Sequence, residues 1–117
     1  MIQPLEWVGG AKKEFLKLPK SVLKDFGRGL LLAQQGQKAA FARPLKGFGG
    51  AGVLELRGNE DGETYRAVYT VQFGGTVYVL AALHKKSKSG IDLPQHEKDL
   101  LQERLKQARE MHRRASG

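Results

Sequence analysis

The amino-acid sequence predicts a small α+β domain, in which one antiparallel β-sheet carries an N-terminal helical hairpin and a C-terminal helix. Two observations lead to this prediction. Apolar residues recur at spacings of three and four near both ends of the chain, as in amphipathic helices, and strand-like apolar runs lie between them. The 117 residues match the size of one domain and contain no linker, so residues 1–117 are assigned to a single unit.

The N-terminal third is predicted to hold an extended segment and two helices. Residues 2–7 form the extended segment, which ends at two glycines. The apolar residues that follow at helical spacing are Phe15, Leu18, Val22, Phe26 and Leu30. Because Pro19 disfavours helical geometry at the residue before it, the pattern divides into helices over residues 11–18 and 20–35. The glycine-rich stretch 37–52 is predicted to be an irregular loop.

The middle of the chain is predicted to form three antiparallel strands joined by short turns. The first covers residues 53–57 and is followed by a polar turn over 58–62. In the second, residues 65–73, aromatic and small apolar side chains at the odd positions alternate with the mostly polar side chains at the even positions. Gly74-Gly75 then forms a tight turn into a third strand over 76–83. Because this third run is apolar on both faces, we expect a central strand that is covered on both sides.

A polar loop over residues 84–93 leads to the C-terminal helix. Pro94 suits the first turn of this helix, and Glu97 follows it where the helix dipole favours an acid. One stripe of the helix holds Leu101, Leu105, Ala108 and His112. The stripe can serve the core or a partner protein, and the sequence does not separate the two.

The excess of cations points to polyanionic partners. Twenty Lys and Arg residues against twelve Asp and Glu residues give a net charge of +8, which attracts phosphate groups. The alternative is that this charge only keeps a small domain soluble. Its distribution favours the first interpretation, since Lys85-Lys86-Ser87-Lys88 holds three cations and no acid, whereas residues 92–114 mix five acids with six bases.

Several kinds of protein are excluded by what the sequence lacks. Without cysteine there is no disulfide framework, thiolate nucleophile or Cys-ligated zinc, and three scattered histidines give no reason to expect a metal site. No apolar run approaches the roughly 18 residues of a membrane-spanning helix, and the N-terminus lacks the order of a secretory signal. We therefore expect a cytoplasmic domain that uses no metal, cofactor or membrane.

Short segments spread over nearly the whole chain form a further pattern. They are Trp7-Val8-Gly9-Gly10, Phe15-Leu16-Lys17-Leu18-Pro19, Ala33-Gln34-Gln35-Gly36, Arg43-Pro44-Leu45, Gly52-Val53-Leu54-Glu55-Leu56-Arg57, Tyr65-Arg66-Ala67-Val68-Tyr69, Val77-Tyr78-Val79-Leu80, Lys85-Lys86-Ser87-Lys88 and Pro94-Gln95-His96-Glu97. In this order they resemble the phage-derived HigB-like branch of the RelE/ParE superfamily, the toxins of type II toxin–antitoxin pairs. The resemblance implies a RelE-like fold and metal-independent cleavage of messenger RNA, usually on the ribosome. It also implies a helix-turn-helix antitoxin, HigA-like, encoded by an adjacent gene.

Metal-free cleavage of RNA needs a group that accepts the 2′-OH proton, a group that stabilises the phosphate charge and a group that protonates the leaving oxygen. Arg66 matches the arginine of the family's Tyr-Arg-x-x-Tyr strand motif, and its planar fork suits a phosphate. Arg57 could hold the same or a neighbouring phosphate, or it could pair with Glu55. The alternative for Arg66 is a solvated arginine on an exposed face of the sheet, and Arg57 could also pair with an acid of the turn.

The remaining candidates surround the basic run. Lys85, Lys86 and Lys88 are expected to bind RNA or ribosome phosphates, and Lys86 is also a candidate acid or base. His84 is a candidate base, because neighbouring cations would keep its imidazole neutral. The alternatives are a cationic loop that discourages aggregation and an ordinary surface histidine.

A non-catalytic alternative stays open. ParE-like members are similar in fold and act on DNA gyrase. In addition, Ala81-Ala82-Leu83-His84 stands where the resembling sequences tend to read His-Ala-Phe-Gln. The strand histidine is thus replaced by Ala81, and His112 is the nearest counterpart of a C-terminal residue that several relatives use. The cations at Arg57, Arg66 and 85–88 favour cleavage, whereas the replaced histidine favours a toxin or binding module that does not cleave RNA.

Overall fold

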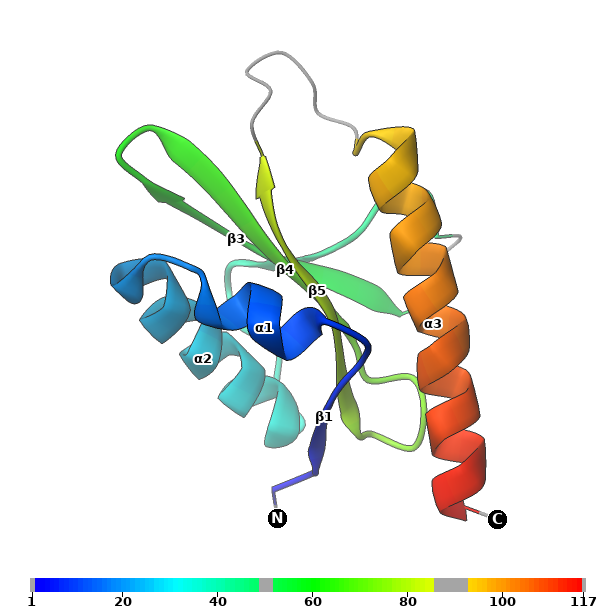
Figure 1. Cartoon of the computed structure of the whole chain (residues 1–117). Helices are drawn as coiled ribbons and strands as arrows, with labels where there is room; N and C mark the ends of the chain where they lie inside the picture. The colour runs from blue at the N-terminus through cyan, green and yellow to red at the C-terminus, as the bar shows by residue number, and fades with distance from the viewer. Residues whose placement is uncertain (1, 49–51, 86–92, 117) are drawn as a thin grey trace.

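The computed structural model describes residues 2–48, 52–85 and 93–116, and it confirms the α+β class (Figure 1). These residues form a five-stranded sheet and three helices. In chain order the elements are β1 (Leu5–Trp7), α1 (Ala11–Leu16), α2 (Lys20–Gln34), β2 (Ala42–Pro44), β3 (Val53–Glu60), β4 (Glu63–Thr70), β5 (Val77–Lys85) and α3 (Gln95–Ser116).

The strand order of the sheet is β1-β5-β4-β3-β2, and it adds two pairings to those expected from the sequence. β1 pairs in parallel with β5, with Leu5 opposite Val77, so the sheet is antiparallel only from β5 to β2. β2 pairs with β3 inside the stretch predicted to be an irregular loop. Both additions are three-residue edge strands, and such short runs have no periodicity of their own.

The turn between β3 and β4 is shorter than the predicted turn over 58–62, which is therefore wrong in its bounds. Both strands continue to a two-residue turn at Asp61 and Gly62, whose φ angles are 52° and 77°. Positive φ at both positions matches the twist of an antiparallel hairpin. Gly58 is a strand residue instead, since it pairs with Tyr65 of β4. A Cβ atom at this position would lie 3.1 Å from Cε1 of Phe26. The glycine thus allows α2 to pack closely on β3.

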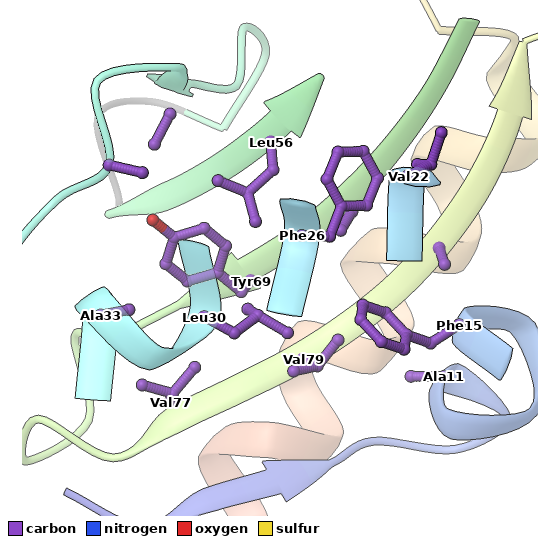
Figure 2. Packing of buried hydrophobic residues seen from close by; sticks show 14 residues of the cluster. Ala11, Phe15, Val22, Phe26, Leu30, Ala33, Leu56, Tyr69, Val77 and Val79 are labelled. Carbon is purple, nitrogen blue, oxygen red and sulfur yellow. The ribbon is translucent and has the colours of Figure 1, made fainter. Parts of the chain in front are cut away.

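The helices lie on opposite faces of the sheet. Helices α1 and α2 cover one face, where Phe15, Phe26 and Leu30 pack against sheet residues such as Leu56 and Tyr69 (Figure 2). Helix α3 covers the other face through the predicted stripe Leu101, Leu105 and Ala108, which packs on Val53, Val68 and Leu80. The stripe therefore belongs to the core, and β5 is covered on both sides as expected.

A bulge in β5 changes which face its last residues occupy. Ala81 lies opposite Val68 while Val79 lies opposite Tyr69, so Leu80 has no partner in the register. An extra residue of this kind shifts the alternation of side chains by one position. Leu80 and Ala81 both pack on the α3 side, and Ala82 then faces the α1–α2 side.

A paired charge joins the two ends of the chain across the edge of the sheet. Arg104 of α3 donates from its two terminal nitrogens to the two carboxylate oxygens of Glu14 in α1, at 2.7 and 2.8 Å. Arg104 also donates to the Leu80 carbonyl at 2.9 Å, and Glu14 accepts from the backbone nitrogen of Ala82 at 3.3 Å. β1 pairs with β5 only as far as Val79, so the next backbone groups on this edge of β5 have no strand partner. The ion pair provides hydrogen bonds to two of them, the Leu80 carbonyl and the Ala82 nitrogen.

Replacing Glu14 by alanine should lower the free energy of unfolding by about 3 kcal/mol, because it leaves a largely buried guanidinium without its partner. Urea denaturation measures this loss. The matched control is Glu110→Ala, which removes a carboxylate whose arginine partners are exposed and should change little. The double variant Glu14→Leu with Arg104→Met should recover only part of the stability. No charge is then left buried, but the Leu80 carbonyl and the Ala82 nitrogen lose their partners. A Glu14→Ala protein as stable as the control would contradict the assigned role.

Candidate functional site

A pocket of about 330 Å³ opens on the α3 side of the sheet, where β2, β3 and β4 meet the start of α3. Five cationic residues and one carboxylate contribute to its lining. The cations are Arg43, Lys46, Arg57, Arg66 and Lys98, and the carboxylate is that of Glu55. The neutral residues of the lining are Pro44, Leu45, Gly47 and Leu93. A concave surface with this charge balance attracts an anion that carries more than one negative charge.

Strand pairing explains why the central residues of the pocket come together. Arg57 of β3 lies directly opposite Arg66 of β4, so both side chains leave the same face of the sheet. Glu55 precedes Arg57 by two positions and therefore projects from that face as well. Two arginines in direct cross-strand register repel each other, and the carboxylate beside them offsets this repulsion.

The ion pairs around Glu55 are unequal. Arg57 donates to one Glu55 oxygen at 3.0 Å, and its side chain remains 40% exposed. The other oxygen lies 3.5 Å from Nε of Arg66 without forming a hydrogen bond. Glu55 and Arg66 are only 5% and 2% exposed. Within the described part of the chain, Oε2 of Glu55 and Nε of Arg66 have no hydrogen-bond partner.

Buried polar atoms without partners are costly, and they need an explanation in a folded protein. Here the two atoms form an ion pair at 3.5 Å in the lining of one pocket, but neither has a hydrogen-bond partner among the described residues. A bound molecule with both a donor and an anionic acceptor satisfies them together. A ribonucleotide is such a molecule, because its ribose hydroxyl is a donor and its neighbouring phosphate is an anionic acceptor.

His84 is not brought together with these arginines. The β5 bulge and strand alternation place it on the α1–α2 face, where its ring stacks on Tyr65 with centroids 4.6 Å apart. Its Nε2 atom lies 2.9 Å from a carboxylate oxygen of Glu63. It lines a separate pocket of about 440 Å³ with residues of α1 and β4. The expectation that His84 acts beside Arg66 is therefore corrected, because the sheet separates the two side chains.

The basic run falls mostly outside the described residues. Lys86 and Lys88 lie beyond them, and Lys85 ends β5 with a side chain that is likewise outside the description. The RNA-binding roles of these three lysines, and the catalytic role of Lys86, stay predictions.

Three other ionisable side chains, those of His112, Tyr78 and Tyr69, lie away from this pocket. His112 packs at the C-terminal end of α3, with its ring 6.0 Å from that of Phe73 and 6.4 Å from that of Tyr78. Burial raises the pKa of the Tyr78 phenol, and the nearby charge of Glu6 raises it further. Burial also raises the pKa of Tyr69, which lies on the α1–α2 face. Neither phenol lines the cationic pocket.

Sequence reasoning missed four residues of the pocket. From the sequence, Glu55 is expected only as a partner of Arg57, although its place two residues earlier on the same strand already puts it on the same face. Arg43, Lys46 and Lys98 come from β2, the loop after it and the first turns of α3. No spacing rule joins such distant segments, so only the tertiary structure reveals that they share a site.

Two further findings concern the described residues alone. Among them, no group of three or more His, Cys, Asp or Glu side chains is arranged to hold a metal ion. In the same part of the chain, no helix is both long and apolar enough to span a membrane.

Solved structures with the same arrangement of elements define the class of fold. A mutant of the E. coli toxin RelE in the free state, with two arginines changed to alanine, superposes with a TM-score of 0.57 and 21% identity over 92% of this chain and 98% of that chain. The toxin–antitoxin complex RelBE2 from Mycobacterium tuberculosis matches with a TM-score of 0.50 and 20% identity over 74% of this chain and 95% of that chain. The chain therefore has the fold of the RelE toxins.

The sequence itself also matches one family model. The model of the family described as phage-derived protein Gp49-like (DUF891) matches residues 13–106. The chain belongs to this Gp49-like family. Among curated proteins, none matches the sequence at a significant level.

Proposed function

We propose that this chain is the toxin of a type II toxin–antitoxin pair and inhibits translation by cleaving messenger RNA. The observation that carries the proposal is the buried pair of Glu55 and Arg66, each with an unpaired polar atom, in the lining of a cationic pocket. The RelE-type fold and the Gp49-like family support the toxin class.

In the proposed reaction, the Glu55 carboxylate accepts the proton of a substrate 2′-OH. The 2′-oxygen then attacks the adjacent phosphorus, and the bond from phosphorus to the 5′-oxygen breaks, which leaves a 2′,3′-cyclic phosphate and a 5′-hydroxyl end. The guanidinium groups of Arg66 and Arg57 stabilise the charge that develops on the phosphate oxygens. The leaving 5′-oxygen takes its proton from an ammonium group, for which Lys98 lines the pocket and Lys86 is the candidate predicted from the sequence.

The partners follow from the same proposal. Lys85, Lys86 and Lys88 would bind phosphates of the message or the ribosome, whereas Arg43 and Lys46 would hold the message at the pocket. The antitoxin would be a HigA-like helix-turn-helix protein encoded by the adjacent gene, and the protein would act in the cytoplasm. A RelE-fold chain is known in a toxin–antitoxin complex, which supports an antitoxin partner here.

Expression of the chain should slow bacterial growth, and purified protein should cut a reporter message on ribosomes. Co-expression of the adjacent antitoxin should restore growth. Primer extension locates the cuts, and end analysis should find 2′,3′-cyclic phosphates. A message with a 2′-deoxy nucleotide at the cut site is the matched control and should stay intact, because the attacking oxygen is missing. A growth-inhibiting protein that leaves the message whole would overturn the nuclease proposal.

One observation favours a second candidate. The described lining of the cationic pocket contains neither histidine nor tyrosine, in keeping with the replacement of the strand histidine by Ala81. A non-catalytic toxin or binding module of this fold, such as a gyrase inhibitor, needs no such group. Loss of DNA supercoiling by gyrase, with intact messages in the same cells, would identify this alternative.

A further inference from the structure

The charge of the cationic pocket exceeds that of the phosphodiester which it is proposed to cut. Five cations and one carboxylate in its lining give a formal charge of +4. A phosphodiester carries one negative charge, and so does a 2′,3′-cyclic phosphate. Among residues 2–48, 52–85 and 93–116, no carboxylate forms an ion pair with Arg43, Lys46 or Lys98. The pocket can therefore hold an anion of higher charge than a phosphodiester.

The most buried charged groups of the pocket determine what should stand beside that anion. Nε of Arg66 and Oε2 of Glu55 lie 3.5 Å apart, and neither has a hydrogen-bond partner in the part of the chain that the structure describes. A ligand that serves both atoms places an anionic acceptor and a donor close together. In a ribonucleotide the 3′-phosphate and the 2′-hydroxyl are on adjacent carbons, whereas a 5′-phosphate is further from either hydroxyl. The two atoms therefore favour a 3′-phosphate.

We propose that the cationic pocket binds ribonucleotide ends that carry a 3′-phosphate monoester, and that such ends inhibit the protein by occupying its site. A phosphate monoester carries about −1.5 to −2 charges at pH 7, so it is attracted more strongly than a diester. Its oxygens accept from Arg66 and Arg57, and the 2′-hydroxyl donates to Glu55. The five cations outweigh the repulsion between this carboxylate and the phosphate. The choice of a ribonucleotide among phosphate monoesters rests on the proposed function.

The inhibitor is related to the product of the proposed cleavage by one hydrolytic step. Cleavage leaves a 2′,3′-cyclic phosphate with a single negative charge. Water adds to its phosphorus and the bond to the 2′-oxygen breaks, which gives a 3′-phosphate, a free 2′-hydroxyl and a released proton. The cyclic end binds the pocket weakly and leaves it, whereas the hydrolysed end binds more tightly and competes with the next message. Hydrolysis of cyclic phosphates is thus the class of reaction that supplies the inhibitor.

Calorimetric titration of the full chain measures this binding without ribosomes or message. Adenosine 3′-phosphate should bind about tenfold more tightly than adenosine 2′,3′-cyclic phosphate, because it carries nearly one charge more. Two further ligands carry the same charge without a hydroxyl beside the phosphate, namely 2′-deoxyadenosine 3′-phosphate and adenosine 5′-phosphate. Each should bind about tenfold more weakly than adenosine 3′-phosphate, because the hydrogen bond to the Glu55 carboxylate is lost.

Two variants and a matched control locate the binding site. Arg66→Gln should weaken the binding of adenosine 3′-phosphate by about tenfold or more, since a buried charged donor is lost. Arg43→Gln alters an exposed residue of the edge strand β2, so the fold should persist, and the affinity should fall by roughly two- to fivefold. Lys106→Gln removes one charge from an exposed position of α3 outside the pocket and should change the affinity little.

Three outcomes would overturn the proposal. Equal affinity for the 3′-phosphate and the cyclic phosphate excludes selection by charge. Equal affinity for the 3′-phosphate, its 2′-deoxy form and the 5′-phosphate excludes the contact with Glu55. An equal loss in the Arg43 and Lys106 variants shows that only net charge matters. A chain that binds the four ligands in the expected order but cuts no message sinks the nuclease proposal alone. In an active chain, adenosine 3′-phosphate should raise the KM for the message and leave kcat unchanged.

Discussion

Glutamine in place of Glu55 should lower the single-turnover rate of RNA cleavage by about 10²–10⁴-fold, the usual contribution of a general base. Glutamine matches glutamate in size and still accepts a hydrogen bond from Arg57, but it cannot take the 2′-OH proton. The loss should therefore appear in the chemical step, with the affinity for the message little changed. The assay is cleavage of a reporter message on purified ribosomes, with circular dichroism as the check on folding.

The control for this experiment is Glu63→Gln, which alters the carboxylate beside His84 on the opposite face of the sheet. It should leave the cleavage rate unchanged, because neither residue lines the cationic pocket. Wild-type activity in a folded Glu55→Gln protein would remove Glu55 from the mechanism. A large loss of cleavage rate in the Glu63→Gln variant would instead indicate that His84 takes part in the reaction.

Alanine in place of Arg66 should reduce the cleavage rate by about 10²–10³-fold, since a preorganised donor to the developing phosphate charge is lost. Antitoxin binding and fold should persist. Lysine at this position should recover only part of the rate, because a point charge cannot reproduce the planar fork of a guanidinium. Arg57→Ala should cost less, since that side chain is 40% exposed and water already screens its charge.

Removing Arg66 also leaves Glu55 with one cation fewer, so a loss of activity needs to be separated from a loss of structure. Added guanidinium ion should restore part of the rate of Arg66→Ala, because it fits the space that the side chain vacates. Rescue of this kind requires a folded pocket. Full activity of Arg66→Ala without any addition would contradict the assigned role.

Much of the fold could be predicted because its long elements carry clear patterns. The apolar spacing in α2 and α3 and the alternation in β4 each follow from burial of one face, and these elements fix the class. The register that sets Arg57 opposite Arg66 was not predicted, because the turn was expected over 58–62 and lies at Asp61 and Gly62. What else escaped prediction depends on contacts between distant segments, such as β1 beside β5 and Arg104 on Glu14.

The candidate site was predictable only where it lies on one hairpin. Glu55 could be placed from its own strand, whereas Lys98 required knowledge of where α3 begins to cross the sheet. His84 was expected in a polar loop over 84–93, whereas β5 continues to Lys85. As a strand residue beyond the bulge at Leu80, His84 is fixed on the α1–α2 face, and nothing in an apolar run marks such a bulge.

The parallel pairing of β1 with β5 has a consequence for the time at which the protein folds. Leu5 pairs with Val77, so the two strands are separated by 77 − 5 = 72 positions, and the contact of Glu14 with Arg104 spans 90. At the usual pace of synthesis of about 5–20 residues per second, β1 leaves the ribosome several seconds before its partner. The α1–α2 hairpin and the β3–β4 hairpin close locally, but the sheet edge waits for late contacts of high contact order. In a nascent chain the cationic pocket is therefore incomplete until α3 emerges, because α3 contributes Lys98 to the pocket and Arg104 to the ion pair with Glu14.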